Sequence, residues 1–243
     1  MTMNNLDEIK AAIQKLSGSD QQTLQAWLAT TSSGADDPSS AHDVALLYDR
    51  VAEPAIAYPE SAEHRWLSVD QYLEFEAQSK LRHEYIDGVV YAMSGASEKH
   101  ETIKVNLLAA IHGHLRGGPC KVYGSEFKVR LQIDRKDLFY YPDVMVACGR
   151  EGVASHYLHY PKLIVEILSP STESIDRREK FLSYKQIGTV EEYVLVSQEA
   201  AQITIYRRAA VWVPQMQTGP DEMAAFQSIG LSLPLAQIYE GVP

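Results

Sequence analysis

From residue 61 onward, the hydrophobic positions alternate between short strand-like runs and longer stretches with helical spacing. Helices are expected where apolar residues recur every three or four positions, and strands where short apolar runs are bounded by Gly, Pro or Ser. The expected helices are 68–75, 103–115, 173–186 and 235–239. The expected strands are the two arms of a hairpin within 82–93, then 121–123, 127–133, 139–146, 163–168, 192–197, 202–207, 211–216 and 224–229. This order predicts a mixed sheet covered by helices, in an α+β or α/β arrangement.

Local cap and turn signals support several of these boundaries. Ser68 and Gln71 have the spacing of a capping box at the start of the first helix. Asp87 and Gly88 form the dipeptide most typical of a tight hairpin turn. In the strand 127–133 the odd-numbered apolar residues are expected to face inward. The residues expected to face outward from that strand are Lys128, Arg130 and Gln132.

The first 40 residues are predicted to form a separate helical hairpin with a linker. Segments 6–13 and 21–28 have helical spacing, and the polar residues 17–20 between them end one helix and cap the next. Residues 30–40 are polar and poor in apolar side chains, as is typical of a flexible linker. The resulting organisation is an N-terminal unit at 1–40, an ambiguous segment at 41–60 and a main domain at 61–243.

Net charge limits how this chain could bind nucleic acid. The chain of 243 residues carries a formal charge of −10, which argues against a broad basic binding surface. The acidity is concentrated near the N-terminus, so the main domain is only mildly acidic. A phosphate substrate is still compatible with such a domain, because metal ions can supply local positive charge.

The chain lacks the features of a membrane or secreted protein. It has no apolar run of about 18 residues, and its start lacks the pattern of a signal peptide. We therefore expect a cytoplasmic protein without a membrane partner. Cys120 and Cys148 have neither zinc-type spacing nor the density of a disulfide scaffold, so we interpret both as reduced, partly buried thiols.

Two carboxylates fall inside apolar runs that would ordinarily form a core. Asp143 lies in the run 139–146, and Glu166 lies in the run 163–168. A lone carboxylate buried in a strand loses much of its hydration energy unless it is neutralised, paired or bound to a cation. Two acids on successive strands could share a hard divalent ion such as Mg²⁺. The alternative is that each acid caps a neighbouring backbone group or pairs with an arginine at a strand end.

Five motifs in the main domain together resemble one protein family. They are Arg-His-Glu-Tyr-Ile-Asp-Gly at 82–88, Met-Ser-Gly-Ala-Ser at 93–97, Tyr-Pro-Asp-Val at 141–144, Val-Glu-Ile-Leu-Ser-Pro-Ser-Thr at 165–172 and Asp-Arg-Arg-Glu-Lys at 176–180. In this order they resemble the Uma-two family of restriction-endonuclease-like proteins, from Trp66 to the C-terminus. The resemblance implies a PD-(D/E)xK nuclease core, in which a mixed sheet is flanked by helices and strand acids bind Mg²⁺ or Mn²⁺.

The resemblance also implies a set of catalytic residues. Asp143 and Glu166 match the two acids of the motif and are implied metal ligands. The simple pattern would place the lysine two residues after Glu166, where this chain has Leu168. Lys180 matches the family's helical lysine, and its long side chain could reach the same site. Glu84 matches the family's N-terminal acid and is implied as a third metal ligand, or as a group that orients a metal-bound water.

These four residues are expected to converge in one pocket, although two of them have structural alternatives. Lys180 could instead form a surface pair with Asp176, four residues earlier on the same helix. Glu84 could instead form a salt bridge with a basic neighbour. The candidate neighbours are Arg82 and Lys80.

The implied function is that of a metal-dependent endodeoxyribonuclease, a hydrolase that cleaves DNA phosphodiester bonds. A divalent ion on Asp143 and Glu166 would activate water, and Lys180 would hold that water or stabilise charge on the phosphate. The alternative is a nuclease fold that no longer cleaves and instead binds nucleic acid or a protein partner, because a fold alone does not decide activity. The oligomeric state is open, and a homodimer is one option.

Several further residues receive secondary interpretations. His100 could approach the pocket or act in the first turn of its helix, and the small-residue loop 94–97 could accept phosphate before that helix. The remaining histidines that we considered lack the spacing of a zinc motif, so we interpret them as solvated or capping; these are His112, His114, His156 and His159. The tyrosines near the motifs are interpreted as packing residues, namely Tyr140, Tyr141 and Tyr184.

Overall fold

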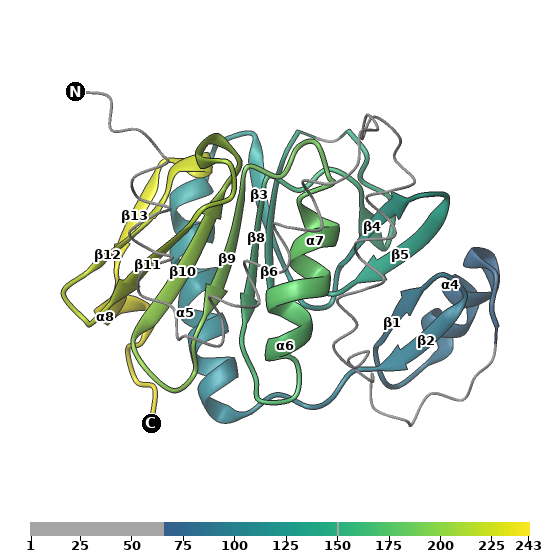
Figure 1. The fold of residues 1–243 in the computed structure, drawn as a ribbon, viewed down its shortest axis with the longest axis horizontal. Helices are drawn as coiled ribbons and strands as arrows, with labels where there is room; N and C mark the ends of the chain where they lie inside the picture. Colours follow the sequence, from purple (N-terminus) through teal and green to yellow (C-terminus); the bar gives the residue numbers. More distant parts are fainter. Residues whose placement is uncertain (1–65, 150) are drawn as a thin grey trace, which may run out of the picture. The chain divides into compact units, whose positions relative to one another are not determined.

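The computed structural model describes residues 66–149 and 151–243. The predicted N-terminal hairpin, its linker and the ambiguous segment 41–60 lie outside these residues, so the proposed N-terminal unit stays a prediction. The described residues form a six-stranded sheet, a five-stranded sheet and a two-stranded sheet, with helices packed against them (Figure 1). The predicted fold class, an α+β arrangement of mixed sheets and flanking helices, is confirmed.

The six-stranded sheet has the strand order β11-β10-β9-β8-β6-β3. Its strands are β3 (Cys120–Gly124), β6 (Val144–Cys148), β8 (Leu163–Ile167), β9 (Glu192–Val196), β10 (Gln202–Arg207) and β11 (Pro214–Thr218). β8 and β9 pair in parallel, whereas the other neighbours in this sheet pair antiparallel. β8 and β9 are buried along their whole length, which explains why their sequences are continuous apolar runs.

Helices cover both faces of this sheet (Figure 1). On one face, α5 (Glu98–Leu115) packs through Ile103, Leu107 and Ile111 against side chains of β6, β8 and β9. The opposite face carries a second core, which includes Ile164 of β8 and Tyr184. The elements that follow β8 in the chain are α6 (Glu173–Ile175), the π-helical segment η1 (Asp176–Lys180) and α7 (Phe181–Tyr184), so the predicted helix 173–186 is a composite of three segments.

The five-stranded sheet has the order β2-β1-β5-β4-β7. Its strands are β1 (His83–Ile86), β2 (Val89–Ala92), β4 (Lys128–Ile133), β5 (Lys136–Tyr140) and β7 (Tyr157–Leu158). β1 and β2 form the predicted hairpin, in which Asp87 and Gly88 have positive φ values of 46° and 99°. The predicted capping box is also present, because the Ser68 side chain accepts from the Gln71 backbone at the start of α4 (Val69–Gln78), while the Gln71 side chain accepts from Ser68.

The predicted strand 139–146 is wrong as a single element. β5 ends at Tyr140 and β6 begins at Val144, and the two strands belong to different sheets. Pro142 lies in the break, where its missing N–H costs no ladder hydrogen bond. This break places Asp143 immediately before β6, at a strand end.

The prediction that Lys128 faces outward is also wrong. Lys128 is only 6% exposed, and its Nζ donates to the Tyr141 hydroxyl at 3.1 Å. Arg130 is half-buried, and its guanidinium is paired with Asp137 at 2.9 Å. Alternation along this strand therefore does not separate a core face from a solvent face, because polar side chains with partners occupy the second face.

The C-terminal elements differ in detail from the prediction. The strand expected at 211–216 begins later, as β11, because Val211 and Trp212 adopt positive φ values of 53° and 62°. The segment expected at 224–229 is β12 (Met223–Phe226), and it pairs with an unpredicted strand, β13 (Leu231–Pro234), in the two-stranded sheet. The final predicted helix is present as α8 (Leu235–Ile238).

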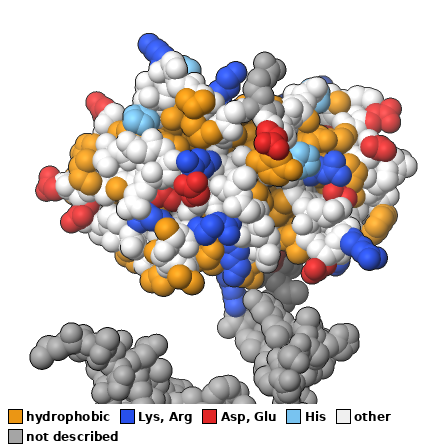
Figure 2. Space-filling view, turned by 90° about the horizontal axis from the view of Figure 1, so that it is seen from above, with side chains coloured by type: hydrophobic (Ala, Val, Ile, Leu, Met, Phe, Trp, Pro, Cys, Tyr) orange, Lys and Arg blue, Asp and Glu red, His pale blue; other side chains and the backbone are white. Residues whose placement is uncertain are grey.

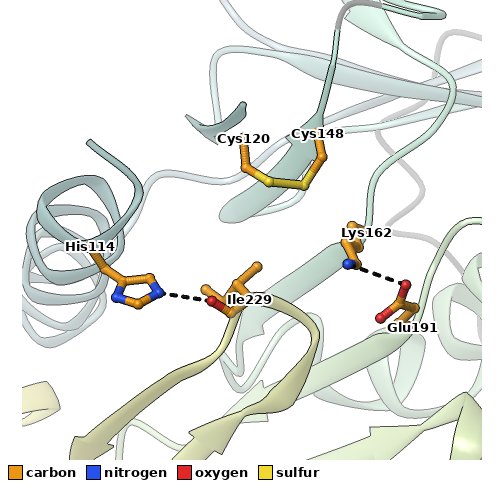
Figure 3. The surroundings of a disulfide bond; sticks show 6 residues. All are labelled: His114, Cys120, Cys148, Lys162, Glu191 and Ile229. Atoms are coloured by element: carbon orange, nitrogen blue, oxygen red, sulfur yellow. Dashed lines mark hydrogen bonds and ion pairs between the residues drawn. A yellow bond between two sulfur atoms is a disulfide. The ribbon is translucent and has the colours of Figure 1, made fainter. Parts of the chain in front are cut away.

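The cysteines are not the reduced thiols that we expected. Cys120 of β3 and Cys148 of β6 lie directly opposite each other in register and form a disulfide, and Cys148 is exposed (Figure 3). Their separation of 28 residues in the sequence does not predict a disulfide. The bond forms because β3 and β6 are neighbours in the sheet.

Within residues 66–149 and 151–243, every helix is too short or too polar to cross a bilayer.

Candidate functional site

One cavity of about 610 Å³ is lined by all four residues of the expected catalytic set. Glu84 comes from β1, Asp143 from the residue before β6, Glu166 from β8 and Lys180 from the last position of η1. Each is at most 9% exposed. The fold thus brings together side chains separated by almost a hundred positions, at the point where the five-stranded sheet, the six-stranded sheet and η1 meet.

Lys180 lies among three carboxylates in this cavity. Its Nζ is 2.9 Å from Glu84 Oε1, 3.4 Å from Glu166 Oε1 and 3.2 Å from Asp176 Oδ1. Burial alone would lower the pKa of the Lys180 ammonium, but the attraction of the three carboxylates outweighs burial and raises this pKa well above its ordinary value. The alternative of a surface pair with Asp176 is confirmed for the pair itself but is wrong about the surface, because both side chains are buried in the cavity.

Glu166 is held by a tyrosine and by a backbone group. The Tyr184 hydroxyl donates to Glu166 Oε1 at 2.9 Å, and the Asp143 backbone N–H lies 3.4 Å from Oε2. Burial raises the pKa of Glu166 well above its ordinary value, although the nearby Lys180 ammonium acts in the opposite direction. Neighbouring acids raise it further, so Glu166 depends on nearby positive charge to remain ionised.

Asp143 is fixed by two donors that reach the same oxygen. Its Oδ2 accepts from the Ile167 backbone N–H at 2.8 Å and lies 3.1 Å from His100 Nε2. His100 therefore approaches the site, as one of its two interpretations expected. It also belongs to the first turn of α5, where the N-cap Ser97 accepts from the His100 backbone N–H.

The alternative for Glu84, a salt bridge with a neighbouring base, is wrong. Arg82 pairs instead with Glu126 at 2.6 Å. Glu84 pairs with Lys180, and the Tyr141 backbone N–H lies 3.4 Å from Glu84 Oε1. β1 thus directs Glu84 into the cavity and leaves the preceding basic side chain at the cavity's exposed edge.

Two functional-site residues were missed by the interpretation of the sequence. Asp176 is 2% exposed and lines the cavity beside Lys180, although its spacing from Lys180 suggested only a surface pair. Tyr184 was interpreted as a packing residue, yet its hydroxyl contacts Glu166. The four-residue steps from Asp176 to Lys180 and from Lys180 to Tyr184 signal one helix face, and that face could have identified both residues.

A second buried polar network adjoins the site through Tyr141. The Tyr141 hydroxyl donates to Glu76 Oε1 at 2.7 Å and accepts from Lys128. Glu76 is 2% exposed and also contacts His83 Nδ1 at 3.0 Å. These contacts tie α4, β1 and β4 to the residue that immediately precedes Pro142 and Asp143. Tyr141 is therefore more than a packing residue.

The donor set fits a hard divalent cation. The buried charged side chains of the cavity are four carboxylates and a single lysine, so negative charge is in excess. These donors are all carboxylate oxygens, which suit Mg²⁺ or Mn²⁺. Within the part of the chain that the structure describes, no three His, Cys, Asp or Glu side chains already converge as ligands. Part of the space between the acids is taken by the Lys180 ammonium.

Charge on the surface is mixed. On the face shown in Figure 2, acidic and basic side chains of the described residues are interspersed among hydrophobic ones. The basic side chains that line the cavity include Arg82 and Lys104, and both are paired with acids, namely Glu126 and Glu101.

Comparisons with known proteins place this chain in a family. The profile of the Uma2 family, described as "Putative restriction endonuclease", matches residues 69–236. Two relatives from Synechocystis are both named as uncharacterized proteins. The protein slr1290 is 37% identical over 77% of this chain and 98% of its own length. The protein sll1609 is 28% identical over 58% of this chain and 81% of its own length. A crystal structure titled as a "putative nuclease belonging to DUF820" from Anabaena variabilis aligns with a TM-score of 0.61 and 17% identity, over 73% of this chain and 99% of that one. This structural likeness establishes a shared fold.

Proposed function

This chain belongs to the Uma2 family, and on that premise we propose that it is a metal-dependent endodeoxyribonuclease that hydrolyses DNA phosphodiester bonds. The observation that carries the proposal is the excess of buried carboxylates around one lysine in a single cavity. Buried acids without compensating charge are strongly destabilising, so a protein keeps such a cluster where a cation binds to it. Nuclease chemistry is chosen because the family is described as one of restriction endonucleases.

The proposed metal ligands are Asp143 and Glu166, with Glu84 as a third. Asp143 directs Oδ2 toward its two hydrogen-bond donors, which leaves Oδ1 for a ligand. A bound Mg²⁺ or Mn²⁺ would supply positive charge and lower the pKa of a coordinated water. His100 and the Ile167 backbone N–H hold the Asp143 carboxylate in place, as the supporting partners of metal ligands commonly do.

Lys180 supplies the second part of the proposed chemistry. In the metal-free protein the three surrounding carboxylates raise the pKa of its ammonium, so we assign Lys180 the role of a positive charge rather than a base. A fixed charge beside the acids can donate to the attacking water or to a phosphate oxygen, and it stabilises negative charge that develops there. Tyr184 helps to keep the carboxylate of Glu166 oriented by donating to one of its oxygens.

Cleavage of DNA by the full-length protein tests the proposal. Purified protein should nick or cut DNA with Mg²⁺ or Mn²⁺ and should fail with EDTA. Assays belong at low ionic strength, since few basic side chains are available to capture the phosphate backbone. Asp143→Asn and Glu166→Gln should abolish turnover while remaining folded. The matched control is Glu191→Gln, which removes an exposed carboxylate that pairs with Lys162 at 3.4 Å.

The result also separates the nuclease from the alternative of a binding module. If wild-type protein binds Mn²⁺ yet cleaves no single-stranded or double-stranded DNA, the nuclease proposal fails and the binding function takes its place. Cleavage that persists unchanged in Asp143→Asn would likewise refute the proposed site.

A further inference from the structure

Asp176 is the buried acid of the cavity that the proposed chemistry leaves without a role. It is 2% exposed, and its Oδ1 lies 3.2 Å from Lys180 Nζ without forming a hydrogen bond of acceptable geometry to any described residue. Burying a carboxylate is costly unless its charge is compensated. Lys180 is the cation that the structure gives it.

The backbone holds Asp176 and Lys180 in one helical turn. They are the first and last residues of η1, a π-helical segment between α6 and α7. The Tyr193 hydroxyl of β9 donates to the Asp176 carbonyl oxygen at 2.8 Å, which anchors the start of this turn to the six-stranded sheet. π-Helical turns are rare in proteins, and those that occur are often found at functional sites. The backbone therefore keeps Asp176 and Lys180 within one turn of each other, so the Asp176 carboxylate is always within reach of the Lys180 side chain.

The three carboxylates around Lys180 are not equivalent. Glu84 and Glu166 are proposed metal ligands, and a divalent cation on their oxygens would repel the ammonium that now contacts them. Asp176 contributes no oxygen to the proposed ligand set and shares its helical turn with Lys180. It is the partner that remains when the other two bind a metal.

We infer that Asp176 is a positioning residue that retains the Lys180 ammonium in the cavity when a divalent cation occupies Asp143 and Glu166. The inference rests on the proposed function, because it assigns Lys180 to the water or phosphate beside that cation. Without Asp176, repulsion by the cation would drive the lysine side chain toward solvent. The cavity would then bind metal but lack the charge that turnover needs.

The test uses Asp176→Asn in the full-length protein, with Asp176→Glu as the conservative variant. We expect the Mn²⁺ affinity of Asp176→Asn, measured by calorimetry, to stay within about threefold of wild type, whereas kcat for DNA cleavage falls by about 10–100-fold, the usual effect of removing a supporting partner. KM should change little, and Asp176→Glu should recover part of kcat. Loss of Mn²⁺ affinity as large as that of Asp143→Asn would make Asp176 a ligand and overturn the inference. So would an unchanged kcat.

A measurement without turnover separates this inference from the proposed function. In Mg²⁺-loaded protein, the Lys180 methylene carbon next to Nζ should show restricted motion by NMR in wild type and free motion in Asp176→Asn; equal mobility would overturn the inference. The resonance is assigned by its loss in Lys180→Arg. If wild-type protein binds Mg²⁺ but cleaves no DNA, the proposed function fails and this measurement still decides the role of Asp176. If wild-type protein binds no divalent cation, both fail.

A variant that does not fold leaves a direct test on wild-type protein. A crystal structure with Mg²⁺ bound should keep Lys180 Nζ within about 4 Å of the Asp176 carboxylate, the limit of an ion pair. A lysine that points out of the cavity in that structure would overturn the inference.

Discussion

Replacing Lys180 by methionine should destabilise the metal-free protein strongly. Methionine keeps much of the volume of the side chain but removes the ammonium that lies within 3.4 Å of Glu84, Glu166 and Asp176. These carboxylates are almost completely buried, so water does not replace the lost charge. Breaking a buried ion pair by removing one partner costs about 3–5 kcal/mol. Protonation of Glu166, whose pKa burial already raises, would relieve part of this cost at low pH.

Thermal unfolding measures the effect. For a chain of this size, a change of 1 kcal/mol shifts Tm by about 2–4 °C, so Lys180→Met should unfold about 6–20 °C below wild type in EDTA. Lys180→Arg keeps the positive charge and is the matched control, with a much smaller decrease. Mn²⁺ should raise the Tm of Lys180→Met more than that of wild type, because the cation then supplies the only positive charge among these acids. Saturation at about 100 times Kd stabilises by about 2.7 kcal/mol.

Two results would refute this reasoning. If Lys180→Met unfolded in EDTA at the same temperature as wild type, the three carboxylates would not depend on the ammonium for their charge balance. If Mn²⁺ stabilised wild type and Lys180→Met equally, the cation and the lysine would not share the same acids.

Three other predictions concern the rest of the chain. Burial lowers the pKa of Lys128 below its ordinary value, so the unfolded chain binds more protons at this residue as pH approaches that value, and stability should rise with pH there. Lys128→Met should therefore raise the free energy of unfolding at pH 7 and should weaken its rise with pH, as measured by urea unfolding from pH 7 to 10. Lower stability of Lys128→Met at pH 7 would contradict this prediction. Reduction of the disulfide, which closes a separation of 28 residues, should lower the free energy of unfolding by about 3–4 kcal/mol in wild type but not in Cys148→Ser, and equal unfolding with and without reductant in wild type would contradict this. Deletion of residues 1–60 should leave a domain that unfolds cooperatively on heating, whereas aggregation of the truncated protein would show that this segment belongs to the main fold.

Much of the fold could be predicted because local signals and burial point the same way. The runs that form β8 and β9 are buried at every position, so their continuous apolar sequences predict buried strands directly. Asp87 and Gly88 determine the hairpin turn through positive φ values that few other residues adopt easily. Asp143 and Glu166 could be identified because residues in a buried apolar run are expected to be apolar, and a carboxylate there needs an explanation.

The remaining features depend on contacts between distant segments. Cys120 and Cys148 pair because β3 and β6 are neighbours, and strand order cannot be derived from spacing alone. The orientation of Lys128 depends on the Tyr141 hydroxyl, which the alternation pattern does not include.

The helix 173–186 was predicted correctly as a region, but its π-helical turn was not. The sequence spacing alone could not show that this turn presents its polar face to buried acids. Asp176 therefore suggested a surface pair, although it contributes to the cavity.

Calorimetric titration of Mn²⁺ into wild-type protein and Asp143→Asn tests the central claim most directly. The substitution keeps the shape of the side chain and an oxygen for the Ile167 backbone N–H, but it removes the negative charge and replaces the oxygen left for the cation by an amide NH2 group. Wild-type protein should bind Mn²⁺ with saturable heat, and Asp143→Asn should lose affinity by at least about tenfold, with Glu191→Gln unchanged. Wild-type protein that binds no Mn²⁺, or Asp143→Asn that binds it as tightly as wild type, would contradict a metal site at this cavity.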